Sequence, residues 1–149
     1  MTLLGPPFSP CKIIQPPGMV LKESTLFHYF QKDRCKDWKT IYYNVRVGKG
    51  IPLPDSYPAW ITRDWMLSTQ HRIDALIETP DSVLIVEVRA LAGRTSFGAL
   101  LLYKQLYEKD PVIKLPVRLV VVSDFVYGQM LESFQENGIE TYLHNIYQQ

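Results

Sequence analysis

The chain has 149 residues, of which 46% are hydrophobic and 21% are charged, so it has the size and composition of one globular domain with a sizeable core. A net charge of +1 excludes a strong overall attraction to nucleic acid, and no apolar run approaches the roughly 18 residues that span a membrane. The chain starts without a signal-peptide pattern, so we expect an intracellular, cytoplasmic protein with no membrane partner. Cys11 and Cys35 are not part of a CxxC pair, which argues against a disulfide framework and against a zinc site.

The first 21 residues are predicted to form an extended arm, followed by a single domain at 22–149. Proline fixes φ and lacks the N–H that helices and central strands need, and the arm contains five prolines: Pro6, Pro7, Pro10, Pro16 and Pro17. Such a terminus becomes ordered when it has a surface to lie against, so we expect the arm to contact protein neighbours in an oligomer or larger assembly. Residues 1–50 carry eight Lys and Arg against three Asp and Glu, which is compatible either with DNA contact or with a solvated surface.

A helix and a strand are predicted after the arm. Residues 22–34 have a rough apolar stripe, which indicates a helix, and residues 40–47 alternate apolar and polar side chains, which indicates a half-buried strand. Pro52, Pro54 and Pro58 then predict an irregular loop. We expect the large apolar side chains that follow to cover one edge of the core: Trp60, Ile61 and Trp65.

A predicted hairpin around the turn at 79–82 brings four charges together. If the residues at the two ends of the turn face each other, Asp74 lies opposite Glu87, and Arg72 lies opposite Arg89, all on one face. Two carboxylates in facing positions repel each other. Either a divalent metal or the two arginines must therefore compensate for them. The other face of the hairpin is uniformly apolar: Ile73, Ala75, Ile77, Leu84, Val86 and Val88.

The chain then alternates between helix and strand. A helix is predicted to begin with Thr95 or Ser96 as its cap and to run to about residue 109. The stretch 115–122 is almost continuously apolar and β-branched, which is typical of a buried central strand. Ser123 or Asp124 is expected to cap a last helix.

A final strand at 139–143 completes the order α-β-β-β-α-β-α-β. A strand, a helix and a strand in succession imply parallel pairing and a right-handed connection. The predicted fold is therefore a three-layer α/β domain with a mixed sheet that is parallel at its centre.

At Asp74 and at the tripeptide Glu87-Val88-Arg89, followed by a helix, the chain resembles the PD-(D/E)XK nuclease superfamily. The αβββαβ core of that superfamily, the restriction-endonuclease-like fold, corresponds to residues 22–143 here. The resemblance implies that Asp74 and Glu87 bind Mg²⁺, that the Val88 carbonyl assists, and that DNA is the substrate. It also loosely matches Glu23 to an acidic residue of the first helix.

Two positions depart from the superfamily pattern. Arg89 stands where the motif has Lys, and Ala99 stands where many members carry Gln. A guanidinium stays protonated near neutral pH, so Arg89 cannot carry protons, although it can still stabilise negative charge on a phosphate. Some members place the Lys on the following helix, but Lys104 is five residues beyond Ala99 and about 140° around that helix, which does not favour the same role.

Two functions follow as hypotheses. The first, which the sequence favours, is a non-catalytic nuclease-fold module in an assembly, such as the head–tail connector of a phage particle. It rests on Arg89, on Ala99 and on mutual neutralisation of two arginines and two carboxylates, Arg72, Asp74, Glu87 and Arg89, with no metal. The alternative is a Mg²⁺-dependent DNA endonuclease in which Asp74, Glu87 and Arg89 are catalytic.

Overall fold

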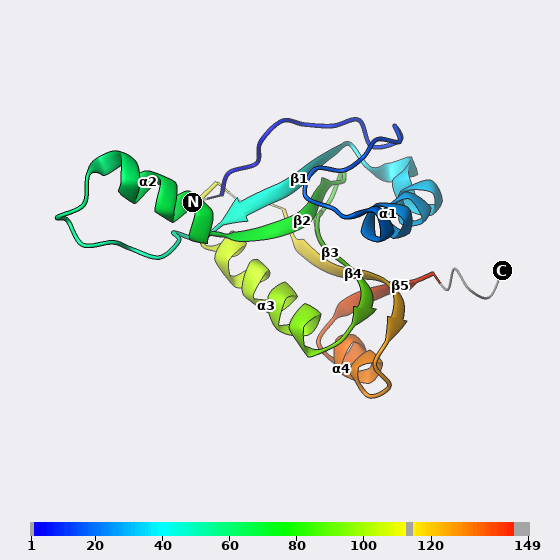
Figure 1. Cartoon of the computed structure of the whole chain (residues 1–149). Coiled ribbons are helices and arrows are strands. Elements are labelled where there is room, and N and C mark those ends of the chain that lie inside the picture. Colours follow the sequence, from blue (N-terminus) through cyan, green and yellow to red (C-terminus); the bar gives the residue numbers. More distant parts are fainter. Residues whose placement is uncertain (1, 113–114, 145–149) are drawn as a thin grey trace.

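A five-stranded sheet forms the centre of the fold in the computed structural model, which describes residues 2–112 and 115–144 (Figure 1). The strands lie side by side in chain order: β1 (Thr40–Val47), β2 (His71–Glu78), β3 (Val83–Ala92), β4 (Val117–Val126) and β5 (Ile139–Leu143). The pairings β1–β2 and β2–β3 are antiparallel, whereas β3–β4 and β4–β5 are parallel. This mixed sheet confirms the predicted α/β class.

Helices cover both faces of the sheet, which makes three layers (Figure 1). The described residues contain these helices: α1 (Leu21–Arg34), α2 (Ala59–Thr69), α3 (Arg94–Glu108) and α4 (Met130–Glu136), with a 3₁₀ turn at Cys35–Asp37. Phe27 and Phe30 of α1 belong to the core on one face, and Leu100 of α3 and Phe134 of α4 belong to the core on the other. None of the helices in the described parts of the chain is long and apolar enough to cross a membrane.

The hairpin of β2 and β3 has the predicted register near its turn but not at its open end. Backbone pairing runs from the turn to Ala75 and Val86, after which the two strands separate. Arg72 pairs with Arg46 of β1 and has no partner in β3. The predicted position of Arg72 opposite Arg89 is therefore wrong.

A break in β1 explains why the alternation fails there. Asn44 has a φ of 51°, a left-handed conformation that a regular strand does not contain. Before this break, Tyr43 and its partner Ala75 pack in the core beside α1; after it, Val45 and its partner Ile73 pack in the core beside α3. In both strands, the buried side chains thus switch from one face of the sheet to the other at the same position along the strands. Ile73 is therefore not on the apolar face predicted for it.

Helix α2 replaces part of the predicted loop and does not cover the core. Trp60 is 67% exposed and Trp65 is 43% exposed, and α2 has no buried residue. Figure 1 shows α2 and the loop before it extending away from the sheet. The expectation that these side chains cover the edge of the core is therefore wrong.

Two predicted helix caps are also wrong. Helix α3 begins after Gly93, so neither Thr95 nor Ser96 is its cap. Strand β4 continues through Ser123 and Asp124, and both are buried. The Asp124 carboxylate lies 3.8 Å from the Nζ of Lys22 on α1 rather than at a helix end.

The N-terminal arm lies along its own domain. Leu3 exchanges backbone hydrogen bonds with Arg46 at 2.9 and 3.3 Å, and Phe8 exchanges them with Ile41 at 2.8 and 3.1 Å. Both contacts are made to β1, an edge strand of the sheet. The Phe8 ring also meets the ring of Tyr43 edge-on, with the ring centroids 5.2 Å apart. The arm is thus ordered by contacts within the chain.

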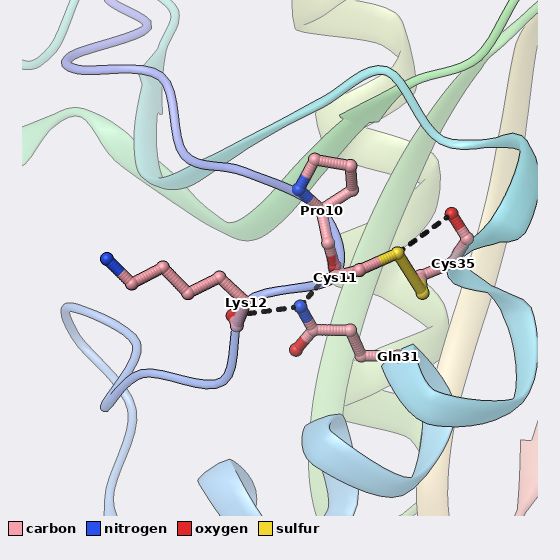
Figure 2. Close-up of a disulfide and its surroundings, with 5 residues drawn as sticks. All are labelled: Pro10, Cys11, Lys12, Gln31 and Cys35. Carbon is pink, nitrogen blue, oxygen red and sulfur yellow. Dashed lines mark hydrogen bonds between the residues drawn. A yellow bond between two sulfur atoms is a disulfide. The ribbon is translucent and has the colours of Figure 1, made fainter.

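A disulfide between Cys11 and Cys35 ties the arm to the end of α1 (Figure 2). The two Cα atoms are 5.8 Å apart, within the normal range for a disulfide. Gln31 of α1 adds a second attachment, because its side-chain amide donates to the backbone carbonyls of Pro10 and Lys12. The prediction against a disulfide is wrong: the arm folds back onto α1 and brings together two cysteines that are 24 positions apart.

Candidate functional site

Asp74 lies where β2 separates from β3. Its Oδ2 accepts a hydrogen bond of 2.9 Å from the backbone N–H of Val88, so a side chain takes a place that a strand carbonyl would otherwise fill. The N–H and C=O of one strand residue point to the same neighbouring strand. The Val88 carbonyl, predicted to assist metal binding, therefore also faces the gap beside Asp74.

Glu87 lies on β3 and is only 3% exposed. Its Oε1 accepts a hydrogen bond of 3.1 Å from the Nε of Arg89, whose side chain is 47% exposed. Its Oε2 is buried and has no hydrogen-bond partner in the part of the chain that the structure describes. A buried carboxylate oxygen without a partner is costly, so this atom has acceptor capacity that a cation or a water would use.

Both carboxyl groups resist ionisation. Burial raises the pKa of Asp74 to about 6, and the hydrogen bond from Val88 offsets only part of this effect. Burial, with the negative charge of Asp74 as the second cause, raises the pKa of Glu87 to about 7, against the lowering effect of Arg89. Near neutral pH the pair thus lacks enough positive charge to hold both groups fully ionised.

Other charges near the pair differ from those predicted. The negative charge of Glu23, on the first turn of α1, raises the pKa of both Asp74 and Glu87. Arg72 is exposed, and it is not among the charges that shift these pKa values. The predicted mutual neutralisation by two arginines is therefore wrong, because Arg89 is the one cation of the described residues that acts on the pKa values of the pair.

Helix α3 contributes a tyrosine that the sequence did not single out. Burial raises the pKa of Tyr103, the charges of Glu87 and Asp74 raise it further, and an interaction of its hydroxyl with the Glu87 side chain is the smallest cause. The Tyr103 hydroxyl therefore lies beside the pair, although its contact with Glu87 falls short of the geometry of a full hydrogen bond. The helical spacing of Tyr103 with other apolar residues indicates only a core position. Lys104, the next residue, instead makes an ion pair of 3.7 Å with Glu108.

The donor set fits Mg²⁺. This ion prefers oxygen ligands and is held in proteins by one or two carboxylates while it keeps several of its waters. The orphaned Glu87 Oε2, the Asp74 carboxylate and the Val88 carbonyl supply oxygens of this kind. Within residues 2–112 and 115–144, no group of three or more His, Cys, Asp or Glu side chains is arranged to hold a metal, so water would complete the ligand set.

A scan of protein-family models finds no match to this sequence, and searches of curated proteins and of solved structures find no match either. The site is therefore interpreted from its own geometry.

Proposed function

We propose that this protein is a Mg²⁺-dependent DNA endonuclease of the PD-(D/E)XK type, with Asp74 and Glu87 as its metal ligands. The observation that carries the proposal is the buried Glu87 Oε2, which has no hydrogen-bond partner in the described structure and lies beside a second carboxylate. One guanidinium faces these two carboxylates, and Glu23 adds a further negative charge. A divalent cation would balance this excess of negative charge.

Each residue has a distinct role in the proposed reaction. Asp74, Glu87 and the Val88 carbonyl would hold Mg²⁺, which when bound polarises a phosphodiester and lowers the pKa of a bound water. Arg89 uses its Nε to fix Glu87 and keeps its two terminal nitrogens for a phosphate oxygen. Its permanent charge would stabilise the negative charge that develops on the phosphate during hydrolysis.

A second candidate function is the non-catalytic module of an assembly, such as a phage particle component. The ion pair between Arg89 and Glu87 favours it, because this contact holds one carboxylate without a metal. We place it second because Arg72 does not help to neutralise the pair. The attachment of the arm to its own domain also provides no direct support for an arm that holds a neighbouring protein.

Calorimetric titration with Mg²⁺ tests the proposal directly. The full-length protein is expected to bind Mg²⁺ at pH 8 and much more weakly at pH 5.5, since protonated carboxyl groups do not ligate the ion. Glu87→Gln should abolish binding at millimolar Mg²⁺. Asp55→Asn is the matched control, because Asp55 is an exposed loop residue, and it should bind as the wild type does.

Cleavage of supercoiled DNA then separates the two candidate functions. The endonuclease is expected to nick the plasmid only with Mg²⁺ or Mn²⁺, and Asp74→Ala should reduce the rate at least a hundredfold. Protein that binds no Mg²⁺ at millimolar concentration would overturn the proposal. Metal binding without cleavage in the wild type, together with cleavage by Arg89→Lys, would identify a nuclease scaffold that has lost its chemistry.

A further inference from the structure

A second concave site lies beside the carboxylate pair, at the start of α3. It is a cavity of about 550 Å³ where the carboxyl ends of β3 and β4 meet the first turn of α3. In sheets with parallel strands, this end of the strands is where ligands commonly bind. Its lining residues are Arg89, Leu91, Gly93, Arg94, Thr95, Ser96, Tyr127, Gln129 and Met130.

The first turn of α3 presents unpaired backbone donors to this cavity. The first N–H groups of a helix have no partner within the helix, and the cap residue here is Gly93, which has no side chain to accept from them. The first turn of this 15-residue helix also carries no acidic residue. The partial positive charge of the helix end is thus available to an anion.

A serine with little exposure gives an independent indication of a ligand. Ser96 is 1% exposed and lines the cavity, its hydroxyl is not among the fully enclosed polar atoms, and it has no hydrogen-bond partner among the described residues, so the cavity is where that hydroxyl can find one. Buried polar side chains are normally hydrogen-bonded. The Ser96 hydroxyl therefore has donor capacity that a ligand in the cavity would use.

Two arginines add full positive charges to the same wall. Arg89 is held by its Nε, and its terminal nitrogens have no partner in the described structure. Arg94 makes no ion pair within the described residues. None of the residues that line the cavity is acidic. A guanidinium binds phosphate through paired hydrogen bonds, so the chemistry of this wall matches a phosphate group.

We propose that this cavity binds a phosphate group of a nucleic-acid strand, between Arg94, Ser96 and the first turn of α3, with Arg89 at the border toward the phosphate that is cut. The proposal deepens the proposed endonuclease function and rests on it for the identity of the ligand. Because Arg89 contacts Glu87 and also lines the cavity, the bound phosphate is a neighbour of the phosphate that is cut. The ring of Tyr127, 59% exposed at the same cavity, is placed to stack on the adjoining base.

Binding is best measured with metal absent. Full-length protein in EDTA is titrated with a fluorescent single-stranded oligonucleotide, once with and once without a 5′-phosphate, and separately with inorganic phosphate by calorimetry. Arg94→Ala is expected to weaken oligonucleotide binding about tenfold and to lower the salt dependence by about one phosphate contact. Arg63→Ala is the matched control, because it removes the same charge from the exposed α2, and it should change affinity less than about twofold.

The two oligonucleotides identify the source of the phosphate. If the effect of Arg94→Ala is confined to the 5′-phosphorylated strand, the cavity holds a terminal phosphate. If it is equal for both strands, the cavity holds an internal phosphodiester, and either result supports the proposal. Ser96→Ala should weaken inorganic phosphate binding several-fold, whereas Tyr127→Ala should weaken only the oligonucleotide.

The outcome is independent of the metal site. The same titrations with Asp74→Asn are expected to give unchanged or tighter binding, since this variant removes negative charge nearby. Phosphate binding without Mg²⁺ binding would leave the cavity assigned and the endonuclease refuted. If Arg94→Ala and Ser96→Ala both fold, as judged by thermal melting, and bind as Arg63→Ala does, the cavity proposal is overturned.

Discussion

Asp74 and Glu87 are arranged at a cost to the stability of the fold. Glu87 is buried and Asp74 is partly buried, and burial is the largest cause of the raised pKa of each. The charge of Asp74 raises the pKa of Glu87 further, and the charge of Glu23 acts on both groups. A protein that needed only a stable hairpin would be served better by apolar residues at these positions. Residues kept at such a cost are typical of functional sites.

This cost predicts a dependence of stability on pH. The raised pKa values mean that the folded state retains protons that the unfolded state has released, so the free energy of unfolding should fall as pH rises from about 4 to about 7. In EDTA at pH 8, Asp74→Asn should be about 2 kcal/mol more stable than the wild type. The asparagine can still accept the hydrogen bond from Val88.

Urea unfolding at pH 4, 6 and 8 measures this effect. The advantage of Asp74→Asn should vanish at pH 4, where both carboxyl groups are protonated in the wild type. Asp55→Asn, an exposed control, should follow the wild type throughout. Equal stability of Asp74→Asn and wild type at pH 8 would show that the pair does not repel.

At the scale of elements, the strands could be predicted from the sequence for two reasons. In β1, burial alternates along the strand and leaves a two-residue alternation of apolar side chains, and in β4, burial on both faces leaves a continuous apolar run. Strands β1 and β5 begin and end at the predicted residues. Helix α2 could not be predicted, because the prolines before it indicate a loop. Its tryptophans are of a residue type that is usually buried, although here they are exposed. The site was only partly predictable. The turn at 79–82 relates Asp74 to Glu87, but nothing in β2 itself reveals that its neighbour β1 has a break at Asn44, where the alternation fails and beyond which Arg72 pairs with Arg46 rather than with Arg89.

The attachment of the arm to α1 also could not be predicted from local sequence patterns, because it joins residues far apart in the chain. It should raise the free energy of unfolding. The Cys11–Cys35 disulfide closes a loop with a sequence separation of 24, which restricts the unfolded chain by about 3 kcal/mol. Cys11→Ser should therefore lower the free energy of unfolding by about that amount. Differential scanning calorimetry measures the change.

Added reductant provides the internal control for this prediction. It should lower the melting temperature of the wild type to near that of Cys11→Ser and leave the variant unchanged. Mg²⁺ affinity should be the same in both proteins, because the disulfide is at the opposite end of α1 from Glu23. If reductant does not change the melting temperature of the wild type, the disulfide does not stabilise the fold and the prediction is refuted.

At the scale of the whole molecule, the arm determines which backbone groups of the edge strand β1 are available for pairing with other chains. Strand β1 is an edge strand, and an exposed edge invites pairing with another strand. Leu3 and Phe8 occupy two positions of this edge with backbone hydrogen bonds. The arm therefore protects the edge, whereas the sequence alone predicted that it would reach a neighbouring protein.

Removal of residues 1–10 distinguishes these two roles, because it deletes both edge contacts but keeps Cys11 and its disulfide. If the arm protects the edge, the truncated protein should form larger species than the full-length chain, increasingly so at higher concentration, because β1 then pairs between molecules. If the arm instead holds a neighbour, truncation should yield smaller species. Light scattering after size-exclusion chromatography measures the mass in each case. Cys11→Ser is the matched control: it loosens the arm without removing it, so it should change mass less than truncation does, and in the same direction.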